Sequence, residues 1–141
     1  MAGRKPSAMN QYLFHDLAAA HRTLHARLND RLKCLGLQVE SWRVLETLSS
    51  HDGFTMGDLA DIVLMNPPTL TKLVDRMVSN GLVQRTLSAE DHRRVHLVLT
   101  DAGTDLVAKV RRHAEEQDRD IVERLGEESA QVLREALRSL A

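Results

Sequence analysis

The sequence LADIVLMNPPTLTKLVDRMVSNGLVQR at residues 59–85 contains two short amphipathic helix patterns joined by a turn. Asn66-Pro67 is typical of a helix start, and Asn80-Gly81 is typical of a helix end. The apolar positions of the first helix are Leu59, Ile62 and Val63, and those of the second are Leu70, Leu73, Val74, Met77 and Val78. Two helices of this size with so short a connection predict a helix-turn-helix.

The apolar period changes from helical to alternating after Gly81. Residues 82–87 and 94–100 are predicted to be strands, because apolar and polar side chains alternate clearly at Val95, Leu97 and Leu99. Residues 88–93 between them are polar and charged, as at the tip of a hairpin. A helix-turn-helix followed directly by a charged hairpin is the winged-helix pattern.

Helices are predicted on both sides of this segment. One long helix carries apolar residues from Leu13 to Leu35 and stops at Gly36, and a shorter one follows around Trp42. Thr55 and Asp58 have the spacing of a capping box. After Thr100 the helical period returns, is broken at Gly126 and ends in a last short helix.

The expected fold is therefore mainly α: four helices, a β-hairpin wing and two more helices. We expect a flexible tail at 1–9, a dimerisation helix at 10–35, a winged helix-turn-helix DNA-binding domain at 36–100 and dimerisation helices at 101–141. The terminal helices have apolar faces too long for the winged helix alone to cover, and aromatic residues make up only 3% of the chain. Both features favour a homodimer whose terminal helices form the dimerisation platform.

Composition and charge narrow the function classes. The 141 residues are 43% hydrophobic and 28% charged, with no apolar run long enough for a membrane span and no signal peptide, so we expect a cytoplasmic protein. The net charge is −1, but it is uneven: +4 for residues 1–35, −4 for 36–65, +2 for 66–100 and −3 for 101–141. A nucleic-acid surface must therefore be a local patch.

Two stretches carry a resemblance to a known family: residues 59–85, and AEDHRRVHLVLTDAG at 89–103. Together they resemble the MarR family of bacterial transcriptional regulators, and GLQVESWRVLETL at 36–48 resembles that family's second helix. The turn Leu64-Met65-Asn66 departs from the family pattern because it lacks a small residue or glycine. The resemblance implies a homodimer of winged helices, usually a repressor, that small anions, oxidants or occasionally metals release from double-stranded DNA.

The candidate DNA-binding residues lie on the second helix of the helix-turn-helix and in the hairpin. Hydroxyls and cations opposite the apolar face of that helix suit a major groove, although they could equally form a solvated face with no target. An Arg at a hairpin tip suits a minor groove, and the resemblance gives that role to Arg93, braced by Asp91. The candidates are Asn66, Pro68, Thr69, Thr71, Lys72, Arg76, Asp91, Arg93 and Arg94.

A small-molecule pocket is expected where the first, second and fifth helices meet. Trp42 offers a stacking face there, and His15, His21 and Arg43 offer hydrogen bonds or charge to a small carboxylate. The resemblance supplies the ligand class, an aromatic or phenolic acid. The alternative is that Trp42 is a core residue and the two histidines are dimer contacts.

Other chemistry finds little support in the sequence. His21 and His25 have a spacing that can hold a metal, but no carboxylate or cysteine is grouped with them, so no metal site is expected. Cys34, the single cysteine, is expected to be buried or inert. No phosphate loop or hydrolase motif is present, so neither catalysis nor a cofactor is expected. The leading hypothesis is a ligand-responsive repressor on a pseudo-palindromic operator, and the alternative is a helical protein-interaction module without DNA binding.

Overall fold

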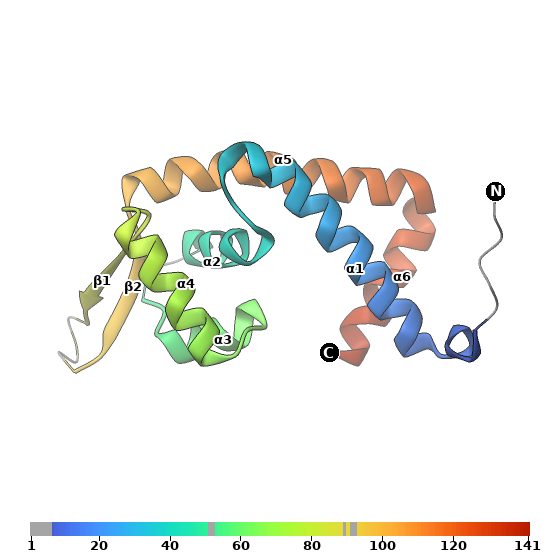
Figure 1. Ribbon diagram of the computed structural model, residues 1–141, viewed down its shortest axis with the longest axis horizontal. Helices are drawn as coiled ribbons and strands as arrows, with labels where there is room; N and C mark the ends of the chain where they lie inside the picture. Colours follow the sequence, from blue (N-terminus) through green and yellow to red (C-terminus); the bar gives the residue numbers. More distant parts are fainter. Residues whose placement is uncertain (1–6, 51–52, 89, 91–92) are drawn as a thin grey trace. The chain divides into compact units, whose positions relative to one another are not determined.

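The computed structural model describes residues 7–50, 53–88, 90 and 93–141 (Figure 1). The chain forms two compact units, Met1–Val39 and Glu40–Ala141, and each is described by itself below. Most of the tail expected at 1–9 lies outside the described residues; its last part leads into a short 3-10 helix, Ala8–Gln11.

The first unit is dominated by one long helix, α1 (Leu13–Leu32), which continues as a 3-10 turn, Lys33–Leu35. Gly36 ends it with a left-handed backbone at φ 69°, as the sequence predicts. Leu28 and Leu32 near the end of α1 are buried, whereas Leu13 and Phe14 at its start are more than 80% exposed. The start of the predicted apolar face of α1 is therefore exposed to solvent in a single chain.

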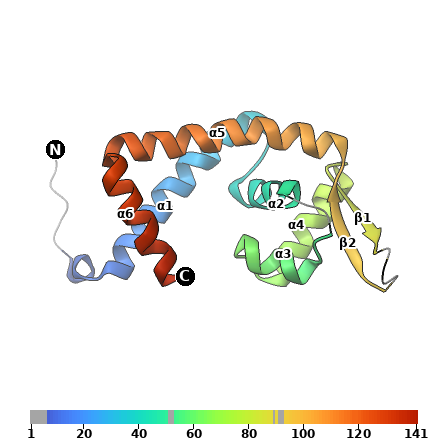
Figure 2. The ribbon, with the colours of Figure 1, turned by 180° about the vertical axis from the view of Figure 1, so that it is seen from behind.

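The second unit contains the remaining elements in the predicted order. They are α2 (Val39–Ser50), α3 (Met56–Val63), α4 (Pro67–Ser79), β1 (Val83–Leu87), β2 (Val95–Leu99), α5 (Asp101–Leu125) and α6 (Glu127–Leu140). The two strands are antiparallel, in register from Val83↔Leu99 to Leu87↔Val95. In both views α2 lies between α5 on one side and α3 with α4 on the other (Figures 1 and 2). The prediction of a mainly helical winged helix is confirmed.

The core of this unit consists of aliphatic side chains from most of these elements. Fully buried members are Val44, Leu45, Leu59, Val63, Leu70, Val74, Val83, Leu97 and Val110. One predicted core residue is wrong: Ile62 is 53% exposed. At 100° per residue, Ile62 lies roughly 100° from the centre of the buried face that Leu59, Ala60 and Val63 form, so it points sideways from α3.

Both predicted helix caps are present. Thr55 Oγ1 accepts a hydrogen bond from Asp58 N at 3.2 Å, and Thr55 N donates to Asp58 Oδ2 at 3.3 Å, which completes the capping box of α3. The hydrogen bonds from Thr55, helped by the nearby charges of Arg94 and His96, hold the pKa of the Asp58 carboxyl below its usual value. At α4, Asn66 Oδ1 accepts from Thr69 N at 3.0 Å.

The turn between α3 and α4 is closed by a strained residue. Leu64 has a left-handed backbone (φ 61°, ψ 42°) and is the one non-glycine residue with positive φ in the described part of the chain. For a side chain with a Cβ this conformation costs roughly 1 kcal/mol. In this turn a leucine therefore adopts the left-handed backbone conformation that a small residue or glycine usually adopts.

The start of α5 is fixed to the turn between α4 and β1. Thr100 N donates to Leu82 O at 3.1 Å, and Thr100 Oγ1 donates to Gly81 O at 2.5 Å while accepting from Gly103 N at 3.1 Å. Gly103 lies directly on this turn, since a Cβ built on it would be 2.2 Å from Leu82 O. We call these contacts of Gly81, Leu82, Thr100 and Gly103 the α5 junction.

We expect Gly103→Ala to lower the free energy of unfolding by about 1–3 kcal/mol, because a methyl group must displace backbone at Leu82. Urea unfolding followed by circular dichroism measures the change. The matched control is Gly57→Ala in α3, where the nearest atom to the new Cβ is 3.9 Å away and the helix gains an alanine. Equal effects from the two variants would show that Gly103 does not depend on close approach to Leu82.

Candidate nucleic-acid interface

The helix α4 has one buried face and one exposed face. Leu70, Leu73, Val74 and Met77 are buried. The predicted contact residues Asn66, Pro68, Thr69, Thr71, Lys72 and Arg76 are all exposed. The structure thus brings these six side chains together along a single helix, next to the hairpin (Figure 1).

Some polar groups on the exposed face of α4 already form hydrogen bonds within the protein, and others do not. Thr71 Oγ1 donates to Pro67 O at 2.9 Å, so its proton is used within the helix. In the described part of the chain, Thr69 Oγ1, Lys72 Nζ and the guanidinium of Arg76 have no hydrogen-bond or ion-pair partner. Asn66 uses its oxygen for the cap, which leaves its amide N–H groups. One hydroxyl, one amide and two cations are therefore available to a ligand.

An ion pair connects this face to the hairpin. Arg85 Nη2 on β1 contacts Asp75 Oδ1 on α4, with side chains 39% and 59% exposed. The pair neutralises the carboxylate that would otherwise repel an anionic ligand from the middle of α4.

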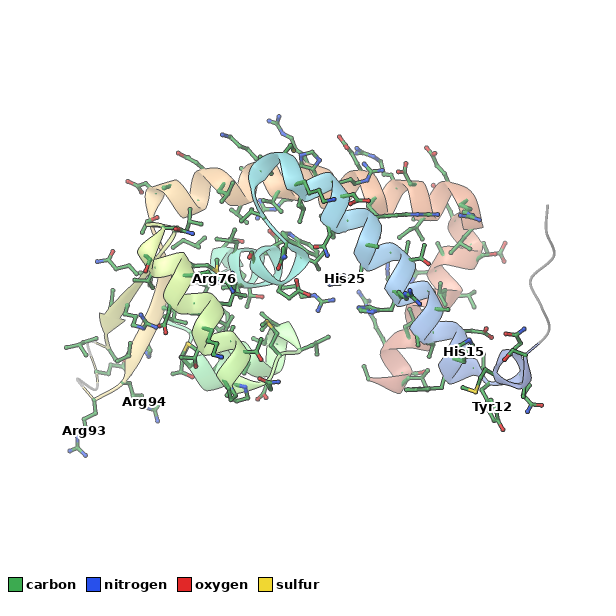
Figure 3. The ribbon with its side chains drawn as sticks, viewed as in Figure 1. Tyr12, His15, His25, Arg76, Arg93 and Arg94 are labelled. Atoms are coloured by element: carbon green, nitrogen blue, oxygen red, sulfur yellow. The ribbon has the colours of Figure 1, made fainter. Side chains whose placement is uncertain are left out.

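The hairpin ends in arginines. Ser88 N donates to Arg94 O at 3.0 Å at the base of the tip. Arg93 and Arg94 are exposed, and Figure 3 shows Arg93 pointing outward from the end of the hairpin. Asp91 lies outside the described residues, so its bracing role stays a prediction.

A second candidate site is a cavity of about 460 Å³ between α2 and α5. Its lining residues are Trp42, Glu46, Arg111, Ala114, Glu115, Asp118 and Arg119. The Nε1–H of Trp42 is buried and has no acceptor among the described residues. Of the predicted pocket residues, Trp42 lines this cavity and Arg43 does not; His15 and His21 lie on α1 in the first unit.

The residues that α5 contributes to the lining of this cavity were not predicted from the sequence. Arg111 is held by Glu46, with Nε and Nη2 each 3.1 Å from a carboxylate oxygen, and its Nη2 also donates to Ser49 Oγ at 3.2 Å. The Glu46 carboxylate raises the pKa of Arg111, so this arginine is a permanent cation. Arg119 has no ion-pair partner within the described ranges. The sequence contains one indication of the cationic partner Arg111: Glu46 follows Trp42 by one helical turn and therefore lies on the same face of the helix.

Among the residues that the structure describes, the remaining reactive side chains form no metal site. The rings of His21 and His25 are 5.4 Å apart, and no group of three potential metal ligands occurs among the described residues. Cys34 is exposed rather than buried, and that it is inert stays a prediction. It lies in the 3-10 turn after α1, with its Sγ 3.4 Å from Arg31 O. Among the described residues, no helix has both the length and the apolarity to span a membrane.

Comparison with known proteins agrees with this architecture. The MarR family model matches residues 35–94. The chain is 30% identical over 125 residues to the HTH-type transcriptional regulator FarR of Neisseria gonorrhoeae, covering 89% of this chain and 86% of that one. It is 30% identical over 97 residues to the homoprotocatechuate degradative operon repressor of Escherichia coli, covering 69% of this chain and 66% of the relative.

Among solved structures, the fold matches that of the transcriptional repressor CouR bound to a 23-mer DNA duplex. The TM-score is 0.89 at 22% identity, with 99% of each chain covered. The assignment to a family rests on sequence as well as on fold, because FarR is 30% identical over 89% of this chain. The chain belongs to the MarR family of winged-helix, DNA-binding transcriptional regulators.

Proposed function

We propose that this protein is a homodimeric, ligand-responsive repressor that binds a pseudo-palindromic operator. The observation that carries the proposal is the exposed face of α4, with Thr69, Lys72 and Arg76 available beside the outward Arg93. In this proposal α4 occupies the major groove and Arg93 the adjacent minor groove. We also propose that the protein works in the cytoplasm and without catalysis.

The proposed dimer rests on apolar surface at both ends of the chain. Leu13 and Phe14 on α1 are 81% and 83% exposed, and Val132 and Leu140 on α6 are 62% and 74% exposed. Large apolar side chains in such numbers mark an interaction surface. We therefore propose that residues 10–35 and 101–141 form the dimer and residues 36–100 contact DNA.

The rival function is a protein-interaction module without DNA binding. Salt discriminates between the two, because neutralising several phosphates releases counterions and makes binding weaken steeply with salt. An apolar protein interface lacks this dependence. The relative CouR is described bound to DNA, which favours the first function for this chain.

We expect Arg93→Ala to reduce operator affinity about 5- to 150-fold at moderate salt and to make the salt dependence shallower. Changes at Thr69 or Lys72 should instead alter which sequences bind. Fluorescence anisotropy on an operator selected from random DNA measures both quantities. The control is Arg112→Ala, which removes one exposed cation from α5 outside the proposed interface. Unchanged affinity in Arg93→Ala would contradict the wing assignment.

The Asp75–Arg85 pair generates a second expectation. Arg85→Gln should weaken DNA binding several-fold, because the Asp75 carboxylate is then unpaired on the α4 face. Adding Asp75→Asn should recover most of the loss, and both variants should change stability by less than about 1 kcal/mol, since the pair is exposed. A double variant that binds more weakly than Arg85→Gln would show that the pair serves another purpose.

For the effector we propose an aromatic or phenolic acid in the cavity between α2 and α5. In this proposal the aromatic ring of the ligand packs against the Trp42 indole, and Arg119 offers a cation for the carboxylate. The relative in Escherichia coli is named as the repressor of a homoprotocatechuate operon, which supports this ligand class. The roles of His15, His21 and Arg43 remain predictions from the sequence.

The effector proposal is tested by titrating benzoic and phenylacetic acids, with and without phenolic hydroxyls, into the protein–operator complex. We expect DNA release together with a change in fluorescence of Trp42, the single tryptophan. Arg119→Ala should require higher acid concentrations, whereas Arg112→Ala should not. Release without a Trp42 signal would place the site elsewhere, and release by peroxide or zinc alone would implicate Cys34 or the histidines.

A further inference from the structure

The leading end of α4 is apolar and exposed. Leu64 is 78% exposed, and Pro67 and Pro68, the first two residues of α4, are exposed as well. We call these three residues the apolar tip. Pro67 and Pro68 directly precede Thr69, the first available hydroxyl of the helix face described above, and Leu64 lies in the turn just before α4.

The backbone at Leu64 indicates that its side chain has a use. Glycine or asparagine would adopt the left-handed conformation at φ 61° with less strain, and either would leave less apolar surface in water. Strain of this kind persists only where the surrounding structure imposes it, and it clusters at binding sites. A leucine that is both strained and exposed favours contact with a ligand at this place.

The apolar tip also lacks the donors with which helix starts usually bind phosphate. Pro67 and Pro68 have no N–H group. Thr69 N donates to Asn66 Oδ1 at 3.0 Å, and Leu70 N donates to Asn66 O at 3.1 Å. All four N–H positions at the start of α4 are therefore absent or engaged, so this helix end does not form the usual anion site.

On the base edges of the major groove, the C5-methyl of thymine is the apolar group that a protein can contact. Resting on the proposed function, in which the start of α4 enters the major groove, we propose that the operator half-site places thymine methyl groups against Leu64, Pro67 and Pro68. The apolar tip then reads thymine by methyl burial, while Thr69, Lys72 and Arg76 supply polar contacts further along the helix.

The test removes the methyl group from the DNA. An operator is first selected from random DNA, and each thymine of one half-site is then replaced by deoxyuridine, which differs by this methyl alone. We expect at least one replacement to lower the affinity of the unaltered protein about three- to tenfold, as burial of a single methyl group predicts. Equal affinity at every position overturns the proposal.

Two variants assign the effect to the apolar tip. Leu64→Asn suits the left-handed backbone but removes the apolar side chain, so it should bind the thymine operator more weakly and show a smaller deoxyuridine effect. It should unfold at a temperature no lower than that of the unaltered protein. Leu64→Met keeps the apolar side chain and should keep the effect. A full deoxyuridine effect in Leu64→Asn would overturn the role of Leu64. If no sequence is selected with salt-dependent binding, the proposed function itself has failed.

Discussion

The winged helix-turn-helix of this protein depends on the α5 junction. Thr100 caps α5 and at the same time hydrogen-bonds to the carbonyl groups of Gly81 and Leu82, and Gly103 leaves space for that turn. The turn lies between the end of α4 and the first strand of the wing. Thr100 therefore connects three elements: α4, the hairpin beside it and the long helix α5.

Under the proposed function, an effector in the cavity between α2 and α5 would control DNA binding through this arrangement. A ligand shifts an equilibrium between two states only if it binds them with different affinity. The cavity lies between α2 and α5, where Glu46 already holds Arg111, so an occupant would act on the relation between these two helices. Because the start of α5 is fixed to the turn between α4 and the wing, we expect a shift of α5 at the cavity to move α4 and the wing with it.

The sequence predicted those features that local signals encode. The caps at Thr55 and Asn66, the glycine at the end of α1 and the strand β2 each depend on residues a few positions apart, and each is present. The burial along β2 does not alternate, however, because Leu97 is buried while Val95 is 43% exposed. The side chains of Asp75 and Arg85 pair across ten positions, and those of Glu46 and Arg111 across 65, so no period within one element indicates them. Leu64 was missed for another reason: the demands of the turn override the preference of leucine for a right-handed backbone.

Native-state hydrogen exchange at the α5 junction tests most directly whether α4, the wing and α5 form one rigid body. The amide of Thr100 bonds to Leu82 O, and the amide of Val74 lies in the buried face of α4. Amides that open in a single cooperative event share one opening free energy. The account predicts that Thr100 and Val74 open with the same free energy, within about 1 kcal/mol. Exchange of Thr100 at a much lower opening free energy than Val74 would contradict it.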